Sequence, residues 1–208
     1  MTQKEIVPHD SRYIVLTQQS FCCLPTCIQM VMIRHNIPLV QSEELAYHFG
    51  LSVTKEFKHL FWNPRLVDKL PKQYSEPTTR ISKPEYEPNK VFKQMGIPLR
   101  FSQTLINQFK KFNDFEEYLK EAIKEGRDTL ICFDWEIANP DYFDNYIGGY
   151  GHVALLDKLI NDKEIRYIDP EHGYSKWPII KIETLYEAMK SHGSDRGAGF
   201  WELEYIKE

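Results

Sequence analysis

The sequence predicts an α+β fold in which helices come first and an antiparallel sheet comes later. An apolar helix over residues 23–35 and a second helix over 42–50 are joined by a short loop. Strand-type runs gather after residue 129 and include a hairpin between 152 and 168. With no internal repeat or evident boundary, the 208 residues are predicted to form a single domain, 1–208, with a substantial core.

Composition excludes several classes of protein. The formal net charge of −4 and the absence of a Lys/Arg run argue against nucleic-acid binding. A hydrophobic fraction of 42% with 27% charged residues is ordinary for a soluble globular protein. The N-terminus lacks a secretory pattern, and no apolar run has the length of a membrane span. We therefore expect a cytoplasmic protein with no nucleic-acid or membrane partner; composition does not indicate the oligomeric state.

The cysteines are unevenly spaced. Cys22, Cys23 and Cys27 lie within six residues, and Cys132 stands alone. This is a poor layout for a disulfide framework and favours reduced thiols, which again fits the cytoplasm.

The segment from residue 18 to 27 leads into the apolar stretch 28–33 and resembles a loop that enters a buried helix. Pro25 suits a first helical turn, and the residues after it are apolar nearly all round. A thiol at such a helix start is close to free backbone N–H groups and the positive end of the helix dipole, which favour thiolate. Cys23 is the predicted nucleophile, and Cys22 is its rival.

The rest of the first half is less regular. Residues 12–16 are predicted to form a short strand. Ser42 is the expected cap of the second helix, and Gly50 its stop. Residues 51–88 give weak signals and are predicted to be an irregular excursion, with a helical segment within 58–70 and a proline-rich stretch after it.

The second half contains clearer patterns. Asn113 is the expected cap of an amphipathic helix that ends at Gly126. The remaining predicted elements are a helix over 89–95, strands over 98–102 and 129–133, a loop over 137–151, a helix over 182–190 and a closing strand over 200–206.

Two residues of the hairpin form a candidate dyad. Strands 152–159 and 164–168 are joined by Asn161-Asp162, a turn pair. The midpoint between His152 and Asp169 falls inside this turn, so the two should lie opposite each other, on one face, within about one residue of register. A carboxylate across from an imidazole fixes its tautomer and leaves the other ring nitrogen to accept a thiol proton.

These residues complete a candidate catalytic site, with Cys23 as nucleophile, His152 as general base and Asp169 as orienting group. An amide side chain shortly before the thiol can stabilise an oxyanion together with the Cys23 backbone N–H, and both Gln18 and Gln19 are available. Glycines at positions 148, 149 and 151 would allow close approach of substrate or backbone. Cys27 and Cys132 are expected in the core.

Three segments resemble the papain-like cysteine peptidases, in particular the bacterial double-glycine leader peptidases of bacteriocin exporters and their stand-alone relatives. They are Gln18 followed by Cys22-Cys23-Leu24-Pro25, then Gly151-His152, then Asp169-Pro170. The order Cys, His, Asp also matches. The family has Asp where this chain has Cys22, Gly where it has Leu24, and its glutamine six rather than five positions before the nucleophile.

The resemblance implies a papain-like fold whose nucleophile helix packs against a C-terminal antiparallel sheet. It implies a peptidase or amidase that cleaves a peptide or small amide substrate through a thioester acyl-enzyme, without a cofactor. Two alternatives stay open: an acyl or peptidyl transferase on the same fold, and a degenerate module that binds a peptide without cleaving it.

A metal site is the other use for clustered thiols. Cys22, Cys23, Cys27 and His35 are the potential ligands. Neighbouring cysteines diverge at a helix start, and no separate CxxC pair exists. The sequence therefore favours a site without metal.

Overall fold

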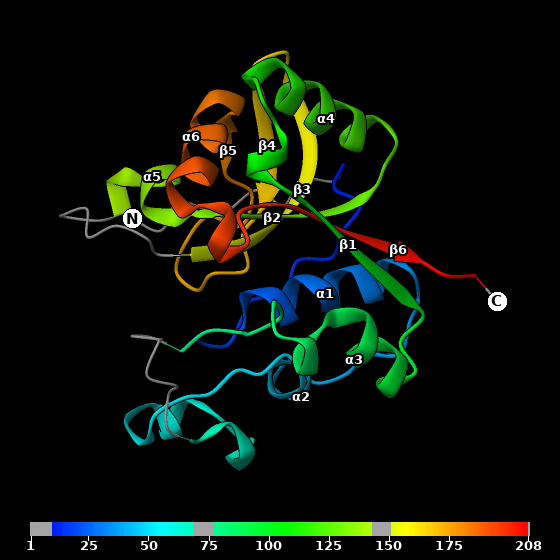
Figure 1. The fold of residues 1–208 in the computed structure, drawn as a ribbon, viewed down its shortest axis with the longest axis vertical. Coiled ribbons are helices and arrows are strands. Elements are labelled where there is room, and N and C mark those ends of the chain that lie inside the picture. The colour runs from blue at the N-terminus through cyan, green and yellow to red at the C-terminus, as the bar shows by residue number, and fades with distance from the viewer. Residues whose placement is uncertain (1–9, 69–76, 143–150, 208) are drawn as a thin grey trace.

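The computed structural model describes residues 10–68, 77–142 and 151–207, which form an α+β fold (Figure 1). Its six-stranded sheet has the order β1-β6-β2-β3-β4-β5, and every neighbouring pair is antiparallel. The strands are β1 (Leu99–Leu105), β2 (Asp128–Asp134), β3 (Gly151–Asn161), β4 (Glu164–Ile168), β5 (Ile179–Lys181) and β6 (Gly199–Tyr205).

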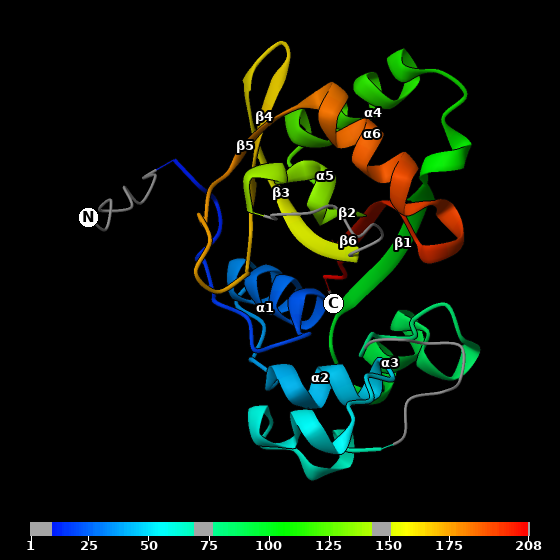
Figure 2. The ribbon, with the colours of Figure 1, turned by 90° about the vertical axis from the view of Figure 1, so that its left-hand side faces the viewer.

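Helices cover both faces of the sheet. Figures 1 and 2 show α1, α2 and α3 on one side of the strands and α4, α5 and α6 on the other. The helices are α1 (Cys23–Arg34), α2 (Ser42–His48), α3 (Pro88–Met95), α4 (Phe112–Lys124), α5 (Trp135–Ala138) and α6 (Ile182–His192).

Strand β2 separates two hydrophobic cores. Leu130 and Cys132 face the core that contains α1, whereas Ile131 and Phe133 face the core that contains α4 and α6. Successive side chains of a strand point to opposite faces, so a strand covered on both sides is apolar throughout. This explains the continuous apolar run in the sequence of β2, every residue of which is buried.

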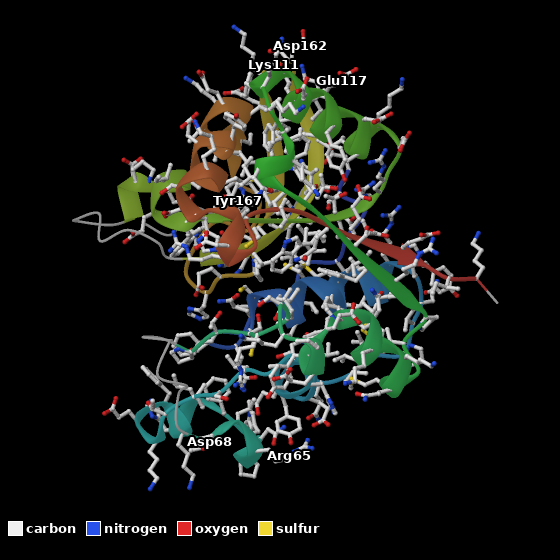
Figure 3. All side chains as sticks on the ribbon, in the orientation of Figure 1. Arg65, Asp68, Lys111, Glu117, Asp162 and Tyr167 are labelled. Atoms are coloured by element: carbon white, nitrogen blue, oxygen red, sulfur yellow. The ribbon has the colours of Figure 1, made fainter. Side chains whose placement is uncertain are left out.

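The core around α4 and α6 includes a fully buried tyrosine. Tyr167 lies in the interior, whereas Lys111, Glu117 and Asp162 lie at the outer end of this half of the molecule (Figure 3). The Tyr167 hydroxyl donates a hydrogen bond to Oδ1 of Asn139 at 3.3 Å, so its polar end has a partner inside the core.

Part of the predicted excursion over 51–88 is packed against α2. Leu51, Val53 and Leu66 form a small core with Cys22 and Ala46. In place of the helical segment predicted within 58–70, the described residues form two short 3₁₀ helices, η1 (Lys55–Leu60) and η2 (Pro64–Leu66), and another, η3 (Pro84–Tyr86), follows. Arg65 and Asp68 lie at this end of the molecule (Figure 3), and residues 69–76 lie outside the described part.

Two helix starts differ from the prediction. Helix α2 begins at Ser42 itself, with Gln41 as its N-cap, and α4 begins at Phe112 with Lys111 as its N-cap. Neither N-cap side chain makes a capping hydrogen bond. Ser42 and Asn113 therefore lie inside the helices that they were predicted to cap, because packing rather than local capping sets these ends.

The strand predicted over 12–16 is wrong. This segment pairs with no strand in the described part of the chain, and side chains hold it in place instead. The Tyr13 hydroxyl donates to Oδ1 of Asp128 at 2.7 Å, and the Ser11 hydroxyl donates to Oδ1 of Asp157 at 3.0 Å.

The predicted loop over 137–151 is also partly helical. Residues 135–138 form α5 and a 3₁₀ turn, η5 (Pro140–Tyr142), follows, while 143–150 lie outside the described part. Strand β5 was not predicted at all. Among the described residues, no helix has both the length and the apolar character needed to cross a bilayer.

Candidate active site

Helix α1 places one thiol at its first residue. The helix begins at Cys23, and the N-cap residue, Cys22, makes no side-chain cap. The first N–H groups of a helix lack intrahelical acceptors, so they and the helix dipole favour negative charge near the Cys23 sulfur. The helix packs against the sheet through buried residues such as Ile28 and Val31, which fixes the position of its N-terminus.

Strand β3 supplies the histidine. His152 is the second residue of β3 and lies opposite Phe133 of β2. Its side chain is only 2% exposed, and the indole of Trp135 lies over it with ring centroids 5.3 Å apart. The two central strands thus hold the imidazole in a closed, aromatic environment.

Asp169 follows directly after β4 and binds the imidazole. Its Oδ1 lies 2.8 Å from Nε2 of His152 and also accepts the backbone N–H of Glu171 at 2.8 Å. Its Oδ2 accepts the indole N–H of Trp135 at 3.1 Å. Because Nε2 of His152 is engaged, Nδ1 is the nitrogen left for Cys23, which lines the same cleft as the imidazole.

The predicted register of this pair is wrong by two residues. Ile168 lies opposite Leu155, so the ladder continued by one step places Asp169 level with Ala154 rather than His152. The turn lies at Asp162-Lys163, between the paired residues Asn161 and Glu164 and later than the predicted midpoint, and the register shifts near Lys158 and near the turn remove only part of this difference. A shift of two keeps both side chains on one face of the sheet, so they still meet, but diagonally.

The pKa values of the pair are shifted in opposite directions. Burial lowers the pKa of His152, but the charge and hydrogen bond of Asp169 and the contact with Cys23 outweigh it and raise the pKa to about 10. Burial raises the pKa of Asp169, but His152 and the hydrogen bonds from Glu171 and Trp135 bring it below its ordinary value. The site therefore favours an imidazolium next to a carboxylate.

The two glutamines have different environments. Gln18 lines the same cleft as Cys23, and its Nε2 donates to Oε2 of Glu171 at 2.5 Å. Its backbone N–H donates to the Pro170 carbonyl at 2.8 Å, which holds it beside the Asp169 loop. Gln19 donates from Nε2 to the Leu60 carbonyl at 3.3 Å and does not line this cleft. Of the two predicted oxyanion donors, Gln18 is thus the one that shares a cleft with Cys23.

The other thiols are buried. Cys22 packs in the small core beside α2, and burial raises its pKa to about 12. Cys27 donates weakly to the Val153 carbonyl at 3.6 Å, and burial raises the pKa of both Cys27 and Cys132 well above the usual range. Cys23 alone is partly accessible, which distinguishes it from its rival Cys22.

A cleft of about 500 Å³ contains Cys23 and His152. Its walls come from the start of α1, residues 77–82, β1, the start of β3, the 3₁₀ helix η6 (Ser194–Arg196) and β6. This volume is in the range of small-molecule and peptide side-chain sites. Gly151, where close approach was expected, borders the cleft, whereas Gly148 and Gly149 lie outside the described residues.

The alternative metal site is not assembled. His35 caps the C-terminal end of α1, the opposite end from Cys23, and its Nε2 lies 2.6 Å from Oδ2 of Asp128. Over residues 10–68, 77–142 and 151–207, no three His, Cys, Asp or Glu side chains are grouped as metal ligands. The ligand set that includes His35 is therefore wrong.

Sequence reasoning missed three residues of the cleft region: Trp135, Glu171 and His192. Trp135 directly follows an apolar strand, and Glu171 is two residues after Asp169, but neither position signals a contact. His192 ends α6, forty residues after His152, and had no recognisable partner in the sequence.

The sequence matches no model of a known protein family, and a search of curated proteins finds no significant match.

Proposed function

We propose that this protein is a cysteine hydrolase with a papain-like fold that cleaves an amide bond through a thioester acyl-enzyme. The observation that supports it best is the position of His152, between the Cys23 thiol and the Asp169 carboxylate. Helix α1, packed against β3 of an antiparallel sheet, supports the papain-like assignment. All four cysteines are free thiols, which supports a cytoplasmic location.

At the start of the first half-reaction the proton of Cys23 is already on Nδ1 of His152, because the site favours the imidazolium, and Asp169 stabilises this charge through Nε2. The thiolate attacks the amide carbonyl carbon and forms a C–S bond. The backbone N–H of Cys23 and the Gln18 amide stabilise the negative charge on the carbonyl oxygen. His152 then gives its proton to the leaving nitrogen as the C–N bond breaks, which leaves a thioester.

In the second half-reaction, water attacks the thioester while His152 accepts one of its protons. The C–S bond breaks, and His152 returns the proton to the sulfur of Cys23. The products are a carboxylic acid and the free thiol, so protons and charges balance over the cycle. The substrate is a peptide or a small amide.

The proposal is tested by labelling with iodoacetamide at graded pH, with the modified cysteine mapped by mass spectrometry. We expect fast labelling of Cys23 well below pH 8.5, whereas an ordinary free thiol, with a pKa of about 8.5, reacts slowly there. The fast phase should disappear in His152→Ala and persist in His59→Ala, a control on an exposed 3₁₀ helix. Slow labelling of Cys23 at the same rate in the native protein and in His152→Ala would contradict catalysis and favour a peptide-binding module. Faster labelling of Cys22 than of Cys23 would identify Cys22 as the nucleophile.

Turnover is then measured on peptidyl coumarin amides with and without hydroxylamine. Release of coumarin with a free acid as co-product supports the hydrolase. A hydroxamate formed in place of the acid at low amine concentration would identify an acyltransferase instead.

A further inference from the structure

A second histidine lies in the wall of the cleft. His192 is the last residue of α6, lines the cleft and is only 6% exposed. Its ring is close to the backbone of Gly151, because a Cβ at that glycine would lie 2.8 Å from Nε2 of His192. Gly151 directly precedes His152, so the second imidazole lies beside the strand that carries the first.

His192 is uncharged at neutral pH. Burial and the nearby charge of Arg196 lower its pKa to about 4, against the opposing effect of Asp134 and Asp195. A neutral imidazole has one N–H donor and one acceptor nitrogen. Nδ1 of His192 is buried with no partner among the described residues, and it is the acceptor in the tautomer that carries its proton on Nε2. His192 therefore presents an unpaired acceptor.

An unpaired buried acceptor is unfavourable, and the ring that carries this one lines a cleft that a substrate can enter. A ligand N–H or O–H at this position would satisfy it. The wall next to it adds negative charge, because Asp195 on η6 is exposed and lines the cleft. The Asp195 carboxylate folds over Gly193, where a Cβ would lie 2.6 Å from Oδ1, so it stays close to the end of α6.

Two further charged residues line the cleft. Glu171 lines it on the side of Gln18. Arg196 lines the described part of the cleft as its one Arg or Lys residue, in addition to the His152 imidazolium. Its guanidinium donates to the backbone carbonyls of His192 at 2.5 Å and Ser191 at 3.0 Å. Asp195 and Glu171 thus bring two carboxylates to the lining of the cleft, and the Arg196 guanidinium is engaged by backbone carbonyls.

We propose that His192 and Asp195 form a specificity subsite for a basic side chain, so that the enzyme prefers peptides with lysine or arginine near the scissile bond. The ammonium or guanidinium donates one N–H to Nδ1 of His192 and pairs with Asp195. The link to catalysis rests on the proposed function, but binding at the subsite requires no turnover.

The test uses the full chain with Cys23→Ala, which cannot form an acyl-enzyme. Fluorescein-labelled alanine hexapeptides carry a single lysine, norleucine or glutamate at each position in turn, and anisotropy gives the dissociation constant. At one position, lysine should bind at least about tenfold tighter than norleucine, and glutamate weaker than both. Norleucine keeps the aliphatic chain of lysine without its charge, so the comparison isolates the ammonium.

Two added substitutions should each abolish this preference: His192→Leu and Asp195→Asn. Asp162→Asn, which removes an acid at the outer end of the same half of the molecule and outside the cleft, should leave it intact. Asp195 is exposed, so its substitution tests the subsite even if His192→Leu fails to fold. Equal binding of lysine and norleucine at every position, or a preference that survives Asp195→Asn, would overturn the proposal.

The same peptides as chloromethyl ketones on the native enzyme separate the two proposals. Labelling of Cys23 without a preference for lysine would refute the subsite and leave the hydrolase intact. A lysine preference in binding without any labelling of Cys23 would keep the subsite and refute the hydrolase.

Discussion

The indole nitrogen of Trp135 donates a hydrogen bond to Oδ2 of Asp169 across 3.1 Å. Trp135 is the first residue of α5, immediately after β2, and its ring also lies over His152. One side chain therefore orients the carboxylate and shields the imidazole that the carboxylate binds. Both contacts come from a segment of the chain that carries none of the three predicted catalytic residues.

Replacing Trp135 by Phe removes the donor but keeps an aromatic ring over His152. Hydrogen bonds to charged groups contribute about 1.5–3 kcal/mol, so we expect a loss of that order in the free energy of unfolding, measured in urea. The pKa of Asp169 should rise, since one of the hydrogen bonds that lowers it is gone. Trp62→Phe, at a side chain 89% exposed, is the control and should change neither quantity.

Substitution of Gln18, with substitution of Gln19 as the matched control, tests which side chain stabilises the oxyanion. Gln18→Ala should lower kcat by about 10²–10³-fold, the usual cost of losing one oxyanion donor. Alkylation of Cys23 by iodoacetamide forms no oxyanion and should keep its rate. Gln19→Ala, whose amide contacts Leu60 outside the cleft, should stay within a few-fold of the native enzyme. The opposite ranking would assign the donor to Gln19.

The His152–Asp169 pair makes stability depend on pH. The folded-state pKa of His152 is raised to about 10, above an unfolded value of about 6.5. Its stabilisation is complete below about pH 6.5 and is lost as the pH rises toward 10, because only the folded state then keeps the proton. The lowered pKa of Asp169 gives the reverse at acid pH, where stability falls as the carboxylate is protonated.

Urea denaturation between pH 6.5 and 10 should therefore show a decrease in the free energy of unfolding on the order of a few kcal/mol, because a tenfold difference in proton affinity between the folded and unfolded states corresponds to about 1.4 kcal/mol. In His152→Gln the decrease should be much smaller. Parallel curves for the two proteins would show that His152 does not carry the effect.

Asp128 fixes the C-terminal end of α1. This buried carboxylate accepts hydrogen bonds from Tyr13 and Arg34 and lies 2.6 Å from Nε2 of His35. Removing one partner of a buried charge network costs about 3–5 kcal/mol, so Asp128→Ala should lower the free energy of unfolding by that order. Glu204→Ala, which breaks a solvent-exposed ion pair, should cost less than about 1 kcal/mol in the same thermal or urea measurement.

Local patterns were enough to predict the start of α1 at Cys23 and the face shared by His152 and Asp169. A helix start depends on neighbouring residues, and strand alternation has a period of two, which survives an even register shift. The register itself was missed, because the turn lies at Asp162-Lys163, later than the predicted midpoint, and the irregularity near Lys158 corrects only part of this difference.

Contacts between segments far apart in the sequence could not be predicted from such local patterns. Residues 12–16 have a strand-like composition but pair with no strand in the described ranges, and the Tyr13 hydroxyl binds Asp128 instead. The position of Trp135 over His152 depends on how β2 and β3 pair, and that of His192 depends on how α6 packs beside them. Tertiary packing decides these placements, and no short segment of the sequence is enough to predict it.

Cys23 belongs to the helical layer, whereas His152 and Asp169 belong to the sheet. The reactivity of the Cys23 thiol therefore reports whether the helical layer and the sheet remain packed against each other. A partial separation that left every helix and strand hydrogen-bonded would still part the sulfur from the imidazole. Thiol reactivity would then change at denaturant concentrations where circular dichroism still reports a native fold, which makes Cys23 a built-in probe of the first step of unfolding.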